Sequence, residues 1–281
     1  MRDLSQRSVG VNDAVMVTLA TTSEFLAALQ HARHIEVRSY TLAPGAVADA
    51  LAAAARRGAA VSVTLAGAPF APAGPAAANA RTLARLRAAG ARTAESAGAF
   101  HAKIARVDGA LYLDDRNWSE RGDTILRVPV AEAPASLATS KQRAIATEVA
   151  LVASARTGER VEIASESFGF ASPLYSTLRL LAARGVGVRL CVDRGELHPG
   201  STEDRALARL AAAGVEVRLG SSSEKFAIRG ARVWVGSANA TYAAPGATDW
   251  GLETRSPAVR AQLHVRFERT WAHARAYPTV R

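Results

Sequence analysis

The chain has 281 residues, of which 49% are apolar and 21% charged, so it can bury one large core or two small ones. This composition excludes a disordered tail protein. A single cysteine, Cys191, excludes an internal disulfide framework and a multi-cysteine zinc site. The formal net charge of +10 favours anionic partners such as nucleic acid or an acidic membrane surface.

No apolar run reaches the roughly 18 residues of a membrane-spanning helix, and Met1–Val15 shows no secretory signal. These features predict a cytoplasmic protein that is at most peripheral to a membrane. The sequence indicates no metal, no cofactor and no obligate protein partner.

The first half alternates strand-like and helix-like segments. Ile35–Leu42 has a strand pattern, and an alanine-rich helix follows and ends near Gly58. A second strand, Val61–Leu65, precedes a helix at Leu83–Gly90. The proline- and alanine-rich stretch Ala68–Ala78 between them is typical of a surface loop.

The second half repeats this order. Val161–Phe168 has a strand pattern, and a helix then runs to Gly185. The strand Val188–Val192 is followed by a helix at Leu207–Gly214 and by a strand at Val215–Leu219. Each predicted helix stops at a glycine, the residue that most readily takes the left-handed conformation that ends a helix.

This internal repeat predicts the architecture. Strands that alternate with helices favour an α/β fold, and two copies of the pattern predict two similar lobes, each a mostly parallel sheet flanked by helices. The lobes are expected at residues 1–135 and 136–281 of one bilobal unit, joined by a helical segment at 136–156. A last helix at Ala261–Tyr277 carries an apolar stripe with a spacing of four, which predicts a core-facing side.

The first half carries the most specific motif. Phe100-His-Ala-Lys-Ile-Ala-Arg-Val-Asp fits H-x-K-x4-D, with His101, Lys103 and Asp108 in its fixed positions. Asn117 follows Lys103 by 14 residues. Lysine is rare in this chain, which uses arginine for almost every cation, so a retained lysine indicates a place that needs a compact ammonium.

The second half keeps a complementary part of the pattern. Lys225 is followed after 14 residues by Asn239, the last residue of a G-S-x-N segment that includes Ser237. The equal spacing aligns the two halves residue by residue. At the aligned positions, Ser223 replaces the histidine and Gly230 replaces the aspartate.

With these paired motifs, the sequence resembles the phospholipase D superfamily, in which two H-x-K-x4-D and G-S-x-N elements meet in one bilobal, metal-independent active site. The resemblance implies that His101 attacks a phosphodiester and forms a phosphohistidine, while lysines and asparagines stabilise the negative oxygens. The catalytic residues that it implies are His101, Lys103, Asn117, Asp123, Lys225 and Asn239. Asp108 is expected to support the fold.

An acidic residue is expected to fix the tautomer of the histidine. Asp123 is the candidate in the first lobe, by analogy with Glu253 in the second. Ser237, Asp115, Ser223 and Glu253 are predicted to line the substrate site. Asp115 stands where the motif has the serine of Gly-Ser, and its charge would repel a phosphate unless it pairs or turns away.

The missing second histidine leaves alternatives open. That histidine would protonate the leaving oxygen, and losing such an acid costs about 10²–10⁴ in rate. His198 and Glu166, at the carboxyl ends of predicted strands, are candidate replacements. The first hypothesis is a phosphodiesterase acting on a phospholipid or a nucleic acid. The alternatives are a pseudoenzyme that binds a phosphate-containing ligand or polyanion, and a nucleic-acid-binding or nicking protein.

Overall fold

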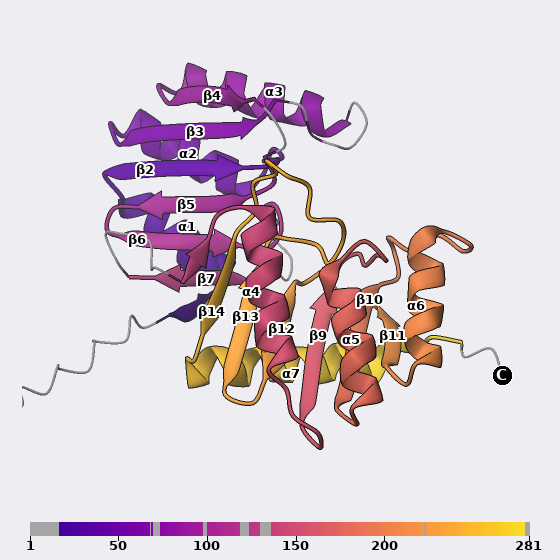
Figure 1. Cartoon of the computed structure of the whole chain (residues 1–281). Helices are drawn as coiled ribbons and strands as arrows, with labels where there is room; N and C mark the ends of the chain where they lie inside the picture. The colour runs from indigo at the N-terminus through magenta and orange to yellow at the C-terminus, as the bar shows by residue number, and fades with distance from the viewer. Residues whose placement is uncertain are drawn as a thin grey trace, which may run out of the picture.

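Two β-sheets, one from each half of the chain, form the framework of the molecule (Figure 1). The structure is a computed structural model that describes residues 17–67, 69, 74–97, 100–118, 124–129, 136–221 and 223–278. The first sheet uses strands between Thr18 and Val128, and the second uses strands between Leu137 and Ala276. The motif residues of both halves lie where these sheets meet.

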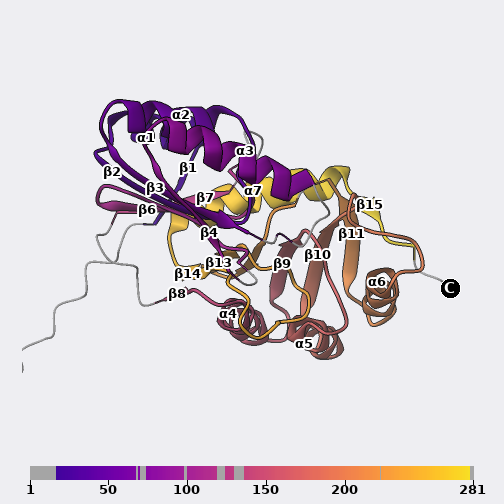
Figure 2. The same ribbon diagram turned by 90° about the horizontal axis from the view of Figure 1, so that it is seen from above.

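The first sheet has seven strands in the order β1-β7-β6-β5-β2-β3-β4. Its strands are β1 (Thr18–Ala20), β2 (His34–Ser39), β3 (Ala60–Ala66), β4 (Arg92–Ser96), β5 (Lys103–Val107), β6 (Ala110–Asp114) and β7 (Ile125–Val128). The helices α1 (Thr22–His31), α2 (Ala46–Arg56) and α3 (Gly74–Ala88) lie together on one of its faces (Figure 2).

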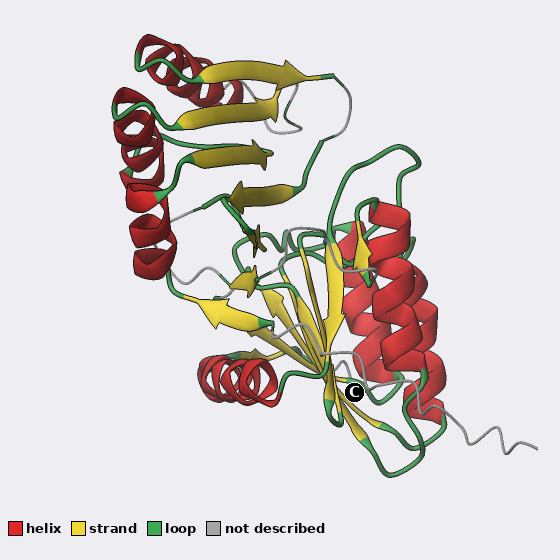
Figure 3. Cartoon of the chain, turned by 90° about the vertical axis from the view of Figure 1, so that its left-hand side faces the viewer, coloured by secondary structure: helices red, strands yellow, loops and turns green. Residues whose placement is uncertain are grey.

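The second sheet has eight strands in the order β15-β11-β10-β9-β12-β13-β14-β8. Its strands are β8 (Leu137–Ala138), β9 (Arg160–Ser165), β10 (Gly187–Asp193), β11 (Glu216–Gly220), β12 (Phe226–Arg229), β13 (Arg232–Gly236), β14 (Gly251–Thr254) and β15 (Arg275–Ala276). The helices are α4 (Lys141–Ala153), α5 (Pro173–Ala183), α6 (Thr202–Ala212) and α7 (Pro257–His273). Figure 3 shows α4–α6 stacked on one face, with α7 apart from them. Among the described residues, no helix is both long and apolar enough to cross a membrane.

The α/β class and the two similar lobes are confirmed, but the strand directions differ from the prediction. In each sheet a parallel trio, β2-β3-β4 or β9-β10-β11, continues into antiparallel strands. The pairs β5-β6 and β12-β13 are tight hairpins, and each is antiparallel to the strand beside it. The sheets are therefore mixed rather than mostly parallel, because each motif begins a hairpin instead of a helical crossover.

The predicted helix ends at four glycines are confirmed. Gly58, Gly90, Gly185 and Gly214 all have φ between 76° and 95°, the left-handed region that glycine enters without steric cost. The loop prediction for Ala68–Ala78 is wrong over its last part, since α3 begins at Gly74. Pro75 stands in the first turn of α3, where its missing N–H costs no helical hydrogen bond, and the alanines after it favour a helix.

One apolar cluster joins the lobes. It combines Leu113 and Leu126 of the first sheet with Phe226 and Val235 of the second, all fully buried. The predicted stripe of α7 also belongs to it: Leu263, Phe267 and Trp271 are buried against the second sheet. Because this core is shared, the two lobes hold a fixed relation to each other, and so do the residues at their seam.

Glu148 is an unusual buried residue of α4. Its carboxyl is 2% exposed, and its Oε2 atom has no hydrogen-bond partner among the described residues. Burial raises its pKa to about 8. The folded protein therefore keeps Glu148 protonated at neutral pH, whereas the unfolded chain ionises it above about pH 4.5.

This difference predicts a pH-dependent loss of stability. Between the unfolded and folded pKa values the native state binds more protons, so the free energy of unfolding falls as pH rises from about 4.5 to 8. We expect this slope to be shallower in Glu148→Gln, by roughly 1 kcal/mol per pH unit. Urea unfolding at pH 5.5 and 7.5 measures both slopes. Equal slopes in the two proteins would contradict the assignment of a protonated Glu148.

Candidate active site

His101 stands just before β5, at the seam between the lobes. Phe100 forms an isolated parallel bridge with Thr248, and the His101 backbone N–H donates to the Thr248 carbonyl at 2.8 Å. The histidine of the first lobe is thus held by the segment of the second lobe that leads into β14. Its side chain remains 19% exposed, so a ligand can reach the ring.

Asp249 fixes the orientation of the imidazole. Its Oδ1 atom lies 2.7 Å from His101 Nδ1, and Ser237 Oγ donates to the same oxygen at 2.7 Å. The Trp250 N–H in turn donates to Ser237 Oγ at 3.0 Å. Burial alone would raise the pKa of Asp249, but its contacts with His101 outweigh burial and lower it. An ionised Asp249 accepts a hydrogen bond from Nδ1–H, which keeps the ring proton on Nδ1 and the lone pair on Nε2.

Lys103 lies against the other ring nitrogen. Its ammonium is 3.0 Å from His101 Nε2, and its side chain is almost completely buried. Burial and the nearby charge of Lys225 lower its pKa to about 7. Burial and Lys103 likewise lower the pKa of His101, so the imidazole is neutral at pH 7. A neutral histidine with a free Nε2 lone pair is the form that can act as a nucleophile.

Lys225, the second-lobe counterpart of Lys103, lies beside a carboxylate instead of a histidine. Lys225 Nζ is 3.1 Å from Glu166 Oε2, and it donates to the Ser223 carbonyl at 2.9 Å. Burial opposes ionisation of Glu166, but the Lys225 ammonium and hydrogen bonds from Lys225 and Asn239 lower its pKa. Glu166 is therefore an anion that neutralises the second lysine. Ser223 contributes its backbone carbonyl to this arrangement.

The two asparagines occupy matching positions after β6 and β13. Asn117 and Asn239 each have a buried Oδ1 atom for which the described part of the chain offers no hydrogen-bond partner. Asn239 also hydrogen-bonds the carboxylate of Glu166. An unpaired buried amide oxygen suits a donor such as a water or a ligand hydroxyl, because leaving it unpaired is costly, whereas the amide NH2 group is the part that can donate to a phosphate oxygen.

Asp115 and Ser237 are structural counterparts, and both are fully buried. Asp115 Oδ1 accepts from the Thr124 N–H at 2.9 Å, as Ser237 Oγ accepts from Trp250. Its other oxygen accepts from the Lys225 N–H at 3.4 Å. Asp115 thus links the first lobe to β12, and its oxygens face backbone amides of the two lobes. Burial raises its pKa to about 7.

The structure does not bring every predicted residue to His101. Glu253 lies on β14 and forms an ion pair with Arg232, with Nε and Oε1 2.6 Å apart. Asp123 lies outside the described residues. Asp108 accepts from the backbone N–H groups of Arg33 and His34, which is the supporting role expected for it.

Asp249 is the residue that the sequence reasoning missed. The backbone N–H of Ser237 donates to the Trp250 carbonyl, as that of Asp115 donates to the Thr124 carbonyl. This register aligns Asp249, not Glu253, with Asp123. The sequence signal was obscured because the loop from Asn117 to Asp123 spans six residues and the loop from Asn239 to Asp249 spans ten.

Similarities to known proteins agree with this geometry. Residues 149–271 match the family described as "Cardiolipin synthase, PLD-like domain". Phosphatidylserine synthase from Haemophilus influenzae superposes with a TM-score of 0.63 at 10% identity, over 92% of this chain and 87% of that one. Polyphosphate kinase from Porphyromonas gingivalis gives a TM-score of 0.62 at 18% identity, over 91% of this chain. The chain spans 50% of the length of that kinase.

Yeast tyrosyl-DNA phosphodiesterase superposes with a TM-score of 0.52 at 10% identity, over 85% of this chain and 88% of that one. No curated protein matches the sequence. The family match covers most of the lobe that lacks the histidine, and the structural matches extend the same fold over the lobe that keeps it. The resemblance seen in the motifs is therefore confirmed by the family match over residues 149–271, and the similar structures share the fold of most of the chain.

Proposed function

We propose that the protein is a phospholipase D-like phosphodiesterase that forms a phosphohistidine on His101. The observation that supports this most strongly is the cross-lobe contact of 2.7 Å between His101 Nδ1 and Asp249, with Lys103 at Nε2. This arrangement yields a neutral, oriented imidazole beside a cation, which is what attack on an anionic phosphodiester requires.

The reaction has two steps. His101 Nε2 forms a bond to phosphorus while the P–O bond to the leaving group breaks, and the leaving oxygen takes a proton from solvent. A water oxygen then attacks phosphorus, the N–P bond breaks, and a proton returns to solvent. Lys103 moves from Nε2 to a phosphate oxygen when substrate binds, and Asn117 and Asn239 donate to the remaining oxygens.

The second lobe limits the range of substrates. Ser223 supplies no acid to the leaving oxygen, and Glu166 is ionised beside Lys225. Leaving groups that depart without protonation are therefore favoured, because a positioned acid is worth about 10²–10⁴ in rate. Substrates of this kind include activated phosphodiesters. The natural substrate is expected to be a phospholipid or nucleic-acid phosphodiester.

A second candidate function is a catalytically impaired protein that binds a phosphate-containing ligand or polyanion. The ion pair between Lys225 and Glu166 favours it, because a lysine already neutralised by a carboxylate contributes less to the stabilisation of a growing negative charge. The two candidates make the same prediction for ligand binding, but only the phosphodiesterase forms a covalent intermediate.

Trapping that intermediate tests the proposal. The protein is mixed in EDTA with a phosphodiester that carries a nitrophenol leaving group, and nitrophenol release is followed. Rapid quenching at alkaline pH and mass spectrometry of the peptide that contains His101 should show one added phosphoryl group that still carries the second ester substituent of the substrate. Release without this adduct, or binding without release by folded protein, would contradict the phosphohistidine mechanism, and the second result would favour the binding protein.

The pKa values of the site predict a narrow pH optimum. We expect kcat/KM to rise as His101 loses its proton, at a pH below 6.5, and to fall as Lys103 loses its proton, near pH 7. Above that point kcat/KM should drop about tenfold per pH unit. In Lys103→Arg the alkaline decrease should disappear, because a guanidinium stays charged. An unchanged alkaline limb in this variant would show that another group titrates there.

A further inference from the structure

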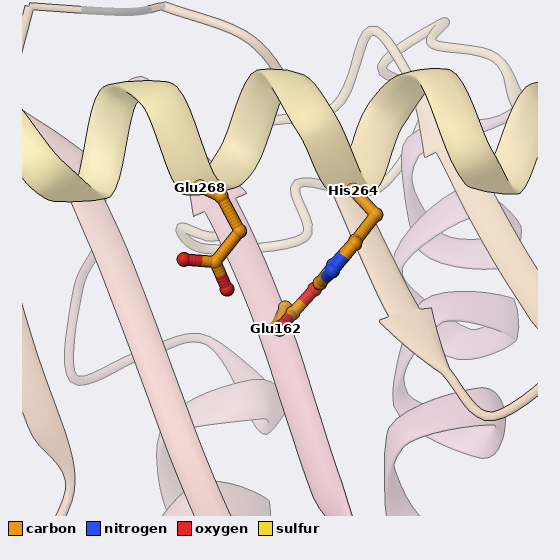
Figure 4. A group of neighbouring side chains, drawn as sticks. All are labelled: Glu162, His264 and Glu268. Atoms are coloured by element: carbon orange, nitrogen blue, oxygen red, sulfur yellow. The ribbon is translucent and has the colours of Figure 1, made fainter.

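Three side chains of types that can bind a metal ion lie together between α7 and β9 (Figure 4). They are Glu162 on β9 and His264 and Glu268 on α7. His264 and Glu268 are four residues apart, so both project from the same side of the helix. One potential ligand atom from each residue lies within 4.8 Å of the other two.

The spacing of these atoms is compatible with a single ion. Ligands about 2.0–2.2 Å from one metal are held within a few ångströms of each other. His264 Nδ1 and Glu162 Oε2 are 2.8 Å apart, and Glu268 lies beside them. An ion that enters between Nδ1 and Oε2 replaces their hydrogen bond. The Nδ1 proton then leaves to solvent, and the metal-bound imidazole carries its proton on Nε2 instead.

Arg189 contacts and orients the carboxylates of both Glu162 and Glu268. Its guanidinium contacts Glu162 Oε1 at 3.4 Å and forms a two-pronged ion pair with Glu268. The guanidinium itself lies 4.2 Å from the centre of the Trp271 ring. Carboxylates that are already fixed by such contacts make better ligands, because less ordering is needed when the ion binds.

The charge of the group also favours a cation. Glu162 is 94% buried, and the carboxylates of Glu162 and Glu268 share the single guanidinium of Arg189. One negative charge is therefore in excess beside a partly buried position. Arg160 and Arg260 line the neighbouring open cavity of about 470 Å³ together with His264, and they moderate this excess without contributing ligands.

From this geometry we propose that Glu162, His264 and Glu268 bind a divalent transition-metal ion such as Zn²⁺. One imidazole and two carboxylates form a mixed donor set that suits zinc better than magnesium. The remaining coordination positions open on the cavity and take water. Glu162 lies on β9 four residues before Glu166, which directly follows that strand, so the two residues are about 13 Å apart at 3.3 Å per residue. The ion therefore stabilises the contact of α7 with the sheet and takes no part at His101.

Zinc titration of the full chain, stripped with a chelator that is then removed, tests this site. Wild type should bind one equivalent of Zn²⁺, measured by competition with a chromogenic chelator, and its Tm should rise. His264→Gln and Glu268→Gln should each weaken binding about tenfold or more. His273→Gln is the matched control, because His273 is an exposed histidine on the same helix that bonds only the Arg269 carbonyl.

The outcomes separate the site from other metal binding. Weaker binding in both variants, with His273→Gln equal to wild type and circular dichroism unchanged, supports the site. Failure of wild type to bind an equivalent of zinc overturns it. So does wild-type affinity in either His264→Gln or Glu268→Gln, or displacement of zinc by millimolar Mg²⁺. Because zinc binding rather than turnover is measured, these results do not depend on the proposed phosphodiesterase.

Discussion

Replacing His101 by alanine should reduce turnover of an activated phosphodiester by roughly 10⁴–10⁶, the range seen when a nucleophile is removed from an enzyme. The variant loses the only described imidazole that is held both by a buried carboxylate and beside a buried lysine. The phosphoryl adduct should disappear with the turnover. Steady-state release of nitrophenol and mass spectrometry of the quenched protein measure both effects.

His31→Ala is a suitable control for this variant, because His31 is an exposed residue at the end of α1. It should retain wild-type turnover. The thermal unfolding of His101→Ala must match that of wild type within a few degrees, since the ring is at the seam of the lobes. A folded His101→Ala variant that keeps more than a tenth of the activity would show that another group attacks phosphorus.

Asp249→Asn should lower turnover by about 10⁴, as expected when a histidine loses the carboxylate that fixes its tautomer. An amide at this place can donate to Nδ1, which moves the ring proton to Nε2 and removes the nucleophilic lone pair. The loss should appear in kcat more than in KM, because Asp249 contacts the histidine through Nδ1 and not the substrate. Steady-state kinetics at pH 6.5 measures both constants.

Glu253→Gln provides the comparison for Asp249→Asn. Both variants neutralise an acidic residue near the start of β14, but Glu253 is paired with Arg232 away from His101. Its turnover should stay within about twofold of wild type, since surface ion pairs contribute little. Equal losses in the two variants would mean that the charge of this segment, rather than the contact with Nδ1, supports activity.

Much of the fold could be predicted from the repeat. The strands at Val61–Leu65 and Val188–Val192 lie within β3 and β10, and the glycine after each helix marks its end. These elements follow from local patterns, namely apolar alternation and the backbone freedom of glycine. The directions of the motif strands could not be predicted from the sequence. Tertiary contacts decide how strands pair in a sheet, and the local pattern of one strand does not contain them.

The candidate site was predictable where spacing is rigid. Lys103 and Asn117 are joined by the hairpin β5-β6, and Lys225 and Asn239 by β12-β13, so both pairs keep the same separation. Asp249 follows a loop, and loops accept insertions at little cost. Its position therefore cannot be read from the spacing of the first lobe. The ion pair of Glu166 with Lys225 depends on contact between segments 59 residues apart in the sequence.

The contacts across the seam mean that each lobe supplies the residues that orient a side chain of the other lobe. In the first lobe, His101 is oriented by Asp249 of the second lobe, and Ser237 of the second lobe hydrogen-bonds that carboxylate. Asp115 aligns with Ser237 and Asp123 aligns with Asp249, so these two positions of the first lobe would orient a histidine at position 223 of the second lobe. With Ser223 in that place, Asp115 instead accepts hydrogen bonds from the backbone N–H groups of Thr124 and Lys225. A histidine introduced at position 223 alone would therefore meet, among the described residues, no carboxylate that is free to orient its ring, so restoring a second histidine requires changes in both lobes.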